Sequence, residues 1–408
     1  MTKQILEGVR VLDLSRVLAG PWASQMLADL GAEVIKVERP GAGDDTRGWG
    51  PPFAKDSADR ETTESAYFLS ANRGKKSITL DITRAEGQKI VRDLARKSDI
   101  LIENYKVGGL RKYGLDFESI HALNPRLVYC SITGFGQTGP YRDRAGYDFM
   151  IQGLGGLMSI TGERDGLPGA GPQKVGVAVT DLFTGLYSSI AILGALRHRD
   201  QTGEGQHIDM ALLDCQVAML ANVSMNYLTS ENVPVRQGNA HQNIVPYQVF
   251  KCRDGYLILA VGNDDQFARF CGEAGVPEIA QDPRYATNQN RVRNRDVLIP
   301  TLEEVFLVRD RDDWLAAFER LGIPAGPINN IGQVFDDPQV IDRGLALSLP
   351  HPTAGKVPSV ANPIRYSATP IRPGAAPPVL GAQVSDVLGD ILGMSGEDIE
   401  RLKEQGII

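Results

Sequence analysis

The first third of the chain alternates between short apolar strands and helices, and this alternation constrains the fold more than any other feature. Strand–helix repeats of this kind build a parallel sheet with helices on its faces. The sequence therefore predicts an α/β fold whose large domain holds a Rossmann-like parallel sheet. We predict strands at residues 9–14, 33–38, 77–82, 100–103 and 127–133, and helices at 21–30 and 85–97.

Ligands of such sheets bind at the carboxyl ends of the strands. We therefore expect a ligand near the loops that follow Leu14, Glu38, Ile82 and Glu103. Several cations converging there would suit a phosphate-bearing ligand, although a solvated rim would show the same pattern. The basic residues that we assign to this edge are Arg16, Arg39, Arg73, Lys75, Lys76 and Lys112.

The pattern changes near residue 225. Two strands at 247–252 and 256–261 flank Asp254-Gly255, a strong hairpin signal, and helices follow at 264–274, 292–307 and 311–321. Residues 324–378 are rich in Pro and Gly, so we expect an extended segment before two last helices at 385–392 and 396–405. The predicted division is a large α/β domain (1–224), a smaller α+β domain (225–325) and a return linker with helices that dock on the large domain (326–408).

Composition excludes several classes of function. The chain has 408 residues and a net charge of −7 with no long basic run, which gives no support for a nucleic-acid partner. Its four Cys and five His show no metal-ligand spacing, so we expect no metal site. Residues 175–196 are long enough for a membrane span, but one Asp and three Gly favour a buried helix. With no signal or transit segment, we expect a cytoplasmic protein without a membrane partner.

Asp181 is the only charged residue in that apolar stretch. A lone ionised carboxylate in such a setting costs several kcal/mol unless it is hydrogen-bonded, paired or neutralised. It could be a partly exposed residue in the first turn of a core helix, where the helix dipole favours it. It could equally be a covalent nucleophile, because Thr180, Thr184 and Gly185 leave space over the carboxylate.

Residues 134–139 (GFGQTG) match the GxGxxG pattern and follow a predicted strand. A dinucleotide site also needs a helix that opens on the third glycine, and Pro140 with the following YRDRAGYD shows none. The motif therefore favours a glycine-rich turn over a ligand.

Several stretches, taken in order, resemble the family III CoA-transferases essentially from end to end. Within the family, residues 43–53, 243–248, 290–295 and 326–330 are most similar to the succinyl-CoA:glutarate branch. The stretches that carry the resemblance are RVLAGPWASQMLADLGAEVIKVERPGAGDDTR (16–47), NRGKKSITLD (72–81), ENYKVGGLRKYG (103–114), ITGFGQTGP (132–140), AGYD (145–148) and VTDLFTG (179–185).

The resemblance implies a ping-pong transfer of CoA from an acyl-CoA such as succinyl-CoA to a dicarboxylic acid such as glutarate. Asp181 matches the catalytic aspartate, which forms first a mixed anhydride and then an aspartyl-CoA thioester. No permanently bound cofactor or metal is implied, and coenzyme A enters as a substrate. Members of the family are interlocked homodimers, and the extended segment 324–378 would fit such a wrapped chain.

The resemblance also implies site residues. Matched CoA contacts are Leu18, Ala19, Arg39, Leu80, Asn104, Tyr105, Lys112 and Tyr147, and weaker candidates for the acyl group's distal carboxylate are Arg16, His241 and Gln248. Three positions depart from an oxalate-specific member: Leu18 replaces Gln, Lys112 replaces Arg, and residues 238–245 replace a run of glycines. Lys112 keeps the charge but loses the bidentate geometry of Arg, whereas the changes at Leu18 and at residues 238–245 argue against a formyl-CoA:oxalate enzyme.

Two other functions remain as alternatives. An α-methylacyl-CoA racemase shares the fold, but it carries His where this chain has Tyr147, and that substitution removes a base with a pKa near neutrality. A CoA-binding protein without turnover is the second alternative, and it would have no use for Asp181.

Overall fold

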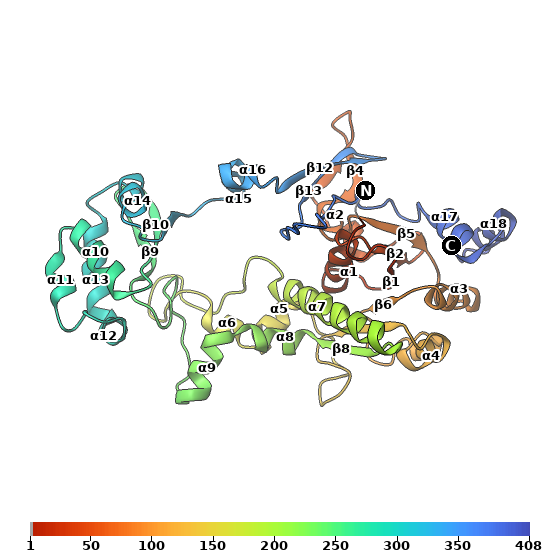
Figure 1. Cartoon of the computed structure of the whole chain (residues 1–408), viewed down its shortest axis with the longest axis horizontal. Helices are drawn as coiled ribbons and strands as arrows, with labels where there is room; N and C mark the ends of the chain where they lie inside the picture. Colours follow the sequence, from red (N-terminus) through yellow and green to blue (C-terminus); the bar gives the residue numbers. More distant parts are fainter. Residues whose placement is uncertain (1–2) are drawn as a thin grey trace. The chain divides into compact units, whose positions relative to one another are not determined.

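The computed structural model describes residues 3–408, which form two compact units (Figure 1). The larger unit takes in residues up to 155 together with 176–220 and 338–408. The smaller unit consists of residues 156–175 and 221–337.

A six-stranded sheet, parallel throughout, is the framework of the larger unit. Its order is β5-β2-β1-β6-β7-β8, and the order reverses between β1 and β6. In a doubly wound sheet this reversal opens a crevice at the carboxyl ends of the two strands. The predicted parallel sheet is thus confirmed. The strands are β1 Arg10–Asp13, β2 Glu33–Glu38, β5 Lys75–Thr79, β6 Ile100–Glu103, β7 Val128–Thr133 and β8 His207–Ala211.

The third predicted strand is misplaced, and so are three of the predicted ligand-edge cations. β5 begins at Lys75 rather than Ser77, so Lys75 and Lys76 lie at the amino end of the strand. The Lys75 ammonium is buried against the carboxylate of Asp13 at 3.2 Å, and Lys76 pairs with a glutamate of β2. Arg73 is buried in an ion pair with an aspartate of α1. Arg73 and Lys75 are thus buried in ion pairs, and the partly exposed Lys76 is paired at the amino end of β2, so none of the three is free to bind a ligand at the carboxyl ends of the strands.

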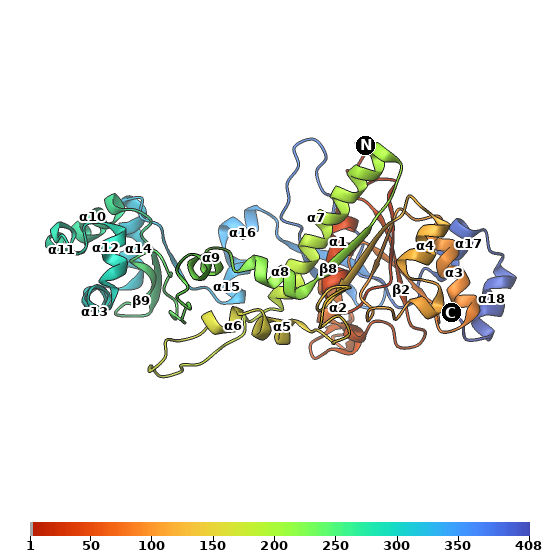
Figure 2. The ribbon, with the colours of Figure 1, turned by 90° about the horizontal axis from the view of Figure 1, so that it is seen from below.

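Helices cover both faces of the sheet, as Figure 2 shows. On one face α1 and α7 pack against apolar side chains that include Val11, Ile102 and Cys130. On the other face α3, α4 and the C-terminal helices enclose a second core that includes Leu12, Leu101 and Tyr129. The helices of this unit are α1 Ala19–Asp29, α2 Ala66–Ala71, α3 Ala85–Arg96, α4 Phe117–Leu123, α5 Asp148–Leu154, α7 Val179–Thr202, α8 Leu212–Met219, α16 Pro338–Asp342, α17 Val384–Leu392, α18 Gly396–Glu404 and the 3₁₀ turns η1 Asp45–Gly48 and η2 Arg111–Tyr113.

Two antiparallel hairpins complete the larger unit. One of them lies within the stretch 324–378, which we expected to be extended without regular structure, and corrects that expectation. Proline is depleted in strands, so Pro350 and Pro358 hide the strand pattern, although a two-stranded hairpin tolerates both. The hairpins are β3 Phe53–Lys55 with β4 Glu61–Ser65, and β12 Ala346–His351 with β13 Gly355–Val360.

The smaller unit contains the predicted hairpin around Asp254-Gly255, and β11 adds a third strand to it. Its core is aromatic, with Phe250, Phe306 and Trp314 packed together. The predicted helix 292–307 is in fact two helices that meet at Asn294. The elements are α6 Leu157–Ile160, α9 Ala221–Ser230, β9 Tyr247–Lys251, β10 Tyr256–Ala260, α10 Asp264–Glu273, α11 Pro277–Gln281, α12 Asn288–Arg293, α13 Arg295–Phe306, α14 Arg311–Arg320, β11 Ala325–Pro327 and α15 Ile331–Asp336.

Helix α7 is long and apolar enough to resemble a membrane span by length and composition, yet it belongs to the core of the larger unit. Ile192, Ala195 and Leu196 are buried against the sheet. Near its start the helix approaches α1 so closely that a Cβ on Gly185 would lie 2.8 Å from the carbonyl oxygen of Ala19. Only glycine allows this approach.

We therefore expect Gly185→Ala to lower the melting temperature by several degrees. The added methyl group meets backbone rather than a flexible side chain, and overpacking of this kind costs about 1–3 kcal/mol. Thermal unfolding followed by calorimetry measures the effect. Gly389→Ala in α17 is the matched control, because its nearest neighbour would be 3.9 Å away. The control should gain about 0.5–1 kcal/mol, and equal melting of both variants would contradict the close packing of α1 and α7.

Candidate active site

Two neighbouring cavities open at the carboxyl ends of the strands. One lies beside β1, β6 and β7, where the strand order reverses, and the other beside β1, β2 and β5. The first, which we call the Asp181 cavity, has a volume of about 230 Å³. The second, the Arg39 cavity, has a volume of about 250 Å³. Both are lined by Arg16, Asp45 and Tyr105, so they share a wall. Both lie entirely within the larger unit.

Most of the residues predicted for the site lie in these cavities. The Asp181 cavity brings together Arg16, Leu18, Ala19, Asn104, Tyr105, Tyr147 and Asp181. The Arg39 cavity holds Arg39 and Leu80, together with Arg16 and Tyr105. Lys112 lines neither cavity; its ammonium lies 4.6 Å from the ring centroid of Tyr113, which lines the Arg39 cavity.

His241 and Gln248 lie in the smaller unit. The ring of His241 packs on Tyr247 with centroids 5.2 Å apart. Gln248 lines a third cavity of about 220 Å³ within that unit, which also contains Arg164 and Arg295. Neither residue is among those that line the two cavities of the larger unit.

Two glycines allow the loop that carries Tyr147 to pack closely against the loop after β7. A Cβ on Gly134 would lie 2.6 Å from the Cα of Gly146, so the loops after β7 and before α5 touch through two glycines. Both glycines line the Asp181 cavity. The first glycine of the GFGQTG motif therefore serves backbone contact at a ligand cavity, in keeping with a turn rather than a dinucleotide fingerprint.

Asp181 is the third residue of α7 and is partly buried. The helix has no side-chain cap from its own N-cap residue, Ala178. Asp148, the first residue of α5, takes that role: one of its oxygens accepts the N–H of Thr180 at 2.8 Å and that of Asp181 at 3.4 Å. Its other oxygen accepts the side-chain amide of Gln152 at 2.7 Å.

The two carboxylates set the ionisation of the site. Burial raises the pKa of Asp181 to about 7, and the negative charge of Asp148 contributes in the same direction. Within residues 3–408 no side chain or backbone group donates a hydrogen bond to the Asp181 carboxylate. A helix N-terminus would favour the ionised form of Asp181, but Asp148 already accepts the N–H groups of Thr180 and Asp181. Asp181 is thus a carboxyl group whose charge is poorly compensated and which faces an open cavity.

Two aromatic side chains stand near this carboxyl group. Trp49 lines the Asp181 cavity and packs edge-on against Tyr67, with ring centroids 5.1 Å apart. Burial raises the pKa of Tyr67 to about 12, and the next causes are the charges of Asp181 and Asp148. The phenol therefore stays protonated at neutral pH and can donate a hydrogen bond to an anion near the carboxylate.

Cations surround the openings of the cavities. Arg16 pairs with Asp45 at 2.9 Å on the shared wall. Arg39, Lys106 and Arg144 have no carboxylate partner among the described residues. Guanidinium and ammonium groups held in this way suit phosphate groups of a ligand.

Several residues near these cavities were not assigned to the site from the sequence: Asp148, Trp49, Tyr67, Lys106, Arg142 and Arg144. Only Asp148 had a usable signal, since it directly follows Tyr147 and could have been recognised as a helix N-terminal carboxylate. The others come from loops whose positions depend on tertiary packing.

A family model that matches most of the chain establishes the family of this protein. The model for CoA-transferase family III matches residues 6–384. The chain belongs to CoA-transferase family III. It is 54% identical to the succinate–glutarate CoA-transferase of Agrobacterium fabrum, over 98% of this chain and 97% of the relative. It is 47% identical to the human succinyl-CoA:glutarate CoA-transferase, over 99% of this chain and 90% of the relative.

A solved structure agrees with this assignment. A CaiB/BaiF family protein from Brucella suis matches with a TM-score of 0.83 and 51% identity, over 96% of this chain and all of that one (100%). This CoA-transferase is therefore an enzyme that uses coenzyme A thioesters, and the predicted resemblance is confirmed.

We expect Asp148→Asn to lower the pKa of Asp181 from about 7, because the substitution removes the neighbouring negative charge and leaves burial as the cause of the shift. The asparagine oxygen can still accept the N–H of Thr180, so α7 should keep its cap. Carbon-13 NMR titration of the Asp carboxyl groups measures the change. Asp143→Asn, an exposed carboxylate in the preceding loop, is the control. An unchanged Asp181 titration in Asp148→Asn would contradict the electrostatic contribution of Asp148.

Proposed function

We propose that this CoA-transferase moves CoA from succinyl-CoA to glutarate or a similar dicarboxylate through covalent intermediates on Asp181. The observation that carries the proposal is a partly buried, uncompensated carboxyl group at the wall of a cavity. The printed names of the relatives support succinyl-CoA as donor and glutarate as acceptor. A covalent nucleophile must be approachable and weakly solvated, and Asp181 meets both conditions.

The proposed reaction has four displacement steps. The Asp181 carboxylate attacks the thioester carbonyl, the C–S bond breaks, and a mixed anhydride and CoA thiolate result. The thiolate attacks the aspartyl carbonyl, releases succinate and leaves an aspartyl-CoA thioester. Glutarate attacks this thioester to give a second mixed anhydride and thiolate. The thiolate then attacks the glutaryl carbonyl of this anhydride, and the bond to the aspartyl oxygen breaks. Glutaryl-CoA leaves, and the Asp181 carboxylate is restored.

The other cavity residues have roles that follow from their positions. Arg39 in its cavity faces phosphate groups of CoA, with Lys106 and Arg144 at the neighbouring opening. Leu18 and Tyr147 border the thioester. Arg16, which lines the Asp181 cavity, is the group that can bind the acid's carboxylates, and the phenol of Tyr67 stands behind it only through its contact with Trp49 of the cavity wall. Coenzyme A is bound as a substrate, and we propose that the enzyme works in the cytoplasm.

The first test traps the intermediate. With succinyl-CoA and hydroxylamine, the wild-type protein should form a hydroxamate on the peptide that contains Asp181. Asp181→Ala should form none and lose CoA-transfer activity by about 10³-fold or more. Asp143→Asn should keep both. Because the nucleophile must be ionised, the rate of acyl transfer to Asp181 should rise with pH through about 7.

Three outcomes would contradict the proposal. An unmodified Asp181 in protein that binds CoA would exclude the covalent mechanism and favour a binding protein. Exchange of the α-proton of a 2-methylacyl-CoA without acyl transfer would indicate a racemase. Absence of glutaryl-CoA or a related dicarboxyl-CoA would exclude the proposed acceptors.

We also propose that the enzyme is a homodimer, with the interlocked arrangement typical of the family. One face of α7 carries exposed apolar residues at helical spacing, namely Phe183, Leu186, Tyr187 and Ile190. Phe149, Met150 and Leu154 of the neighbouring α5 are exposed as well. Contiguous exposed apolar surface of this kind is typical of protein interfaces.

Sedimentation equilibrium should therefore give twice the chain mass for the wild-type protein. Ile190→Asp, which places a charge at the most exposed position of the α7 face, should weaken the dimer by at least about tenfold in dissociation constant. Arg197→Asp, on the same helix beyond the apolar stripe, is the control. A wild-type monomer at micromolar concentration would contradict the proposal.

A further inference from the structure

The loop between β1 and α1 carries a residue in a strained conformation. Val17 has a φ of +70°, a left-handed conformation that β-branched residues avoid. Val17 lines the Asp181 cavity, and so do Leu18 and Ala19, which follow it directly. Surrounding interactions must hold Val17 in this conformation, because the isolated backbone disfavours it.

Side chains from outside the loop bind the backbone on both sides of Arg16. The Lys36 ammonium donates to the carbonyl oxygen of Ser15 at 2.8 Å. The side chain of Asn104 accepts the N–H of Arg16 at 3.0 Å and donates to its carbonyl oxygen at 2.7 Å. The backbone before Val17 is therefore held by β2 and by the segment after β6.

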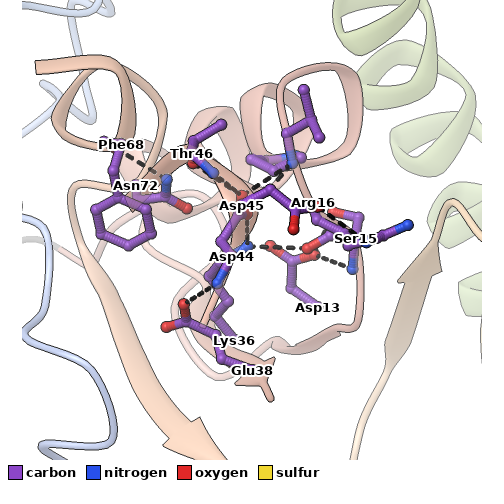
Figure 3. Close-up of polar contacts among 12 residues, drawn as sticks. Asp13, Ser15, Arg16, Lys36, Glu38, Asp44, Asp45, Thr46, Phe68 and Asn72 are labelled. Atoms are coloured by element: carbon purple, nitrogen blue, oxygen red, sulfur yellow. Dashed lines mark hydrogen bonds and ion pairs between the residues drawn. The ribbon is translucent and has the colours of Figure 1, made fainter. Parts of the chain in front are cut away.

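Asp44 holds Val17 itself. Both oxygens of Asp44 accept the N–H of Val17, each at 3.2 Å. The same carboxylate pairs with Lys36 at 2.8 Å and accepts the N–H and hydroxyl of Thr46 (Figure 3). The ion pair therefore contacts the loop at two points, at Ser15 through Lys36 and at Val17 through Asp44.

Lys36 and Asp44 are both charged despite their burial, with side chains 1% and 0% exposed. Burial opposes both charges, yet Lys36 lowers the pKa of Asp44, and Asp44 and Asp13 raise the pKa of Lys36. An ionised acceptor binds an N–H about twice as strongly as a neutral one. Both residues line the Arg39 cavity, but their side chains are almost fully buried. They therefore influence a ligand through the loop that they hold and not by direct contact.

We propose that the buried Lys36–Asp44 ion pair is a positioning device for coenzyme A: it holds Val17 in the left-handed conformation and so sets the wall of the Asp181 cavity. The identity of the ligand rests on the proposed function; the positioning does not.

Asp44→Asn tests the device, because it keeps the shape of the side chain and removes its charge. We expect the Kd for free coenzyme A, measured by calorimetry, and the KM for succinyl-CoA to rise about tenfold. The kcat should fall less than the KM rises. Val17→Gly in the Asp44→Asn background should recover most of the loss, because glycine adopts positive φ without help. A purely structural role for Asp44 predicts no such recovery.

Asp29→Asn is the matched control. It breaks another buried ion pair, that with Arg73, and neither residue lines either cavity. It should lower the melting temperature and leave the Kd for coenzyme A unchanged. An Asp44→Asn protein whose Kd is also unchanged, or a Kd that Val17→Gly does not restore, would overturn the proposal.

If Asp44→Asn does not fold, a second comparison tests the strain at Val17 on which the proposal depends. Glycine normally destabilises a folded chain relative to alanine, but at a φ of +70° the order reverses. Val17→Gly should therefore melt at a higher temperature than Val17→Ala, and the opposite order would overturn the proposal. This comparison needs no coenzyme A. If the wild-type protein binds none, the proposed function fails while the strain at Val17 is still measured.

Discussion

The ligand edge of the sheet depends on one buried carboxylate, that of Asp13 at the end of β1. It accepts hydrogen bonds from Ser15 in the following loop and Ser24 in α1, and it pairs with Lys75 of β5. Burial lowers the pKa of Lys75 to about 8, and Asp13 opposes that effect. Because a buried charge without a partner costs several kcal/mol, these distant segments are stable only when assembled together. Apolar contacts hold the two faces of the sheet, whereas charged contacts hold the edge that faces the ligand.

The ionisation of Asp181 reflects a balance of opposing effects. A helix N-terminus stabilises negative charge, but here Asp148 takes up the first N–H groups and adds a negative charge of its own. Burial then raises the pKa of Asp181 to about 7. A carboxylate with this pKa is a stronger base and nucleophile than a solvated aspartate, yet a large fraction of it is ionised at neutral pH. If Asp181 is the nucleophile that we propose, the raised pKa increases its nucleophilicity at the cost of electrostatic stability in the resting enzyme.

How well the sequence predicted each feature depended on whether the feature is local. The strand at 100–103 was located because it is almost wholly apolar, and the strand at 33–38 because Val and Ile occur in a short segment that follows a helix and a glycine. β5 was shifted because a lysine such as Lys75 is expected to be solvent-exposed. Its burial depends on partners that the local pattern does not show, above all the carboxylate of Asp13, far away in the chain. Asp181 stood out as a lone charge in an apolar helix. Trp49 and Tyr67 could not be found, because their nearness to that charge arises from the packing of separate loops and not from any pattern of neighbours.

The hydrogen bond between Asp148 of α5 and Thr180 of α7 closes a segment that is inserted into the larger unit. The chain leaves the larger unit just after α5 and re-enters it just before α7, so residues 156–175, which belong to the smaller unit, form a loop whose two ends meet at Asp148 and Thr180. Those ends are joined by a hydrogen bond and not by a covalent link. Asp148 and Thr180 both belong to the larger unit, so that unit closes the inserted segment with its own residues. The carboxylate that closes the segment also fixes the first turn of α7, which carries Asp181.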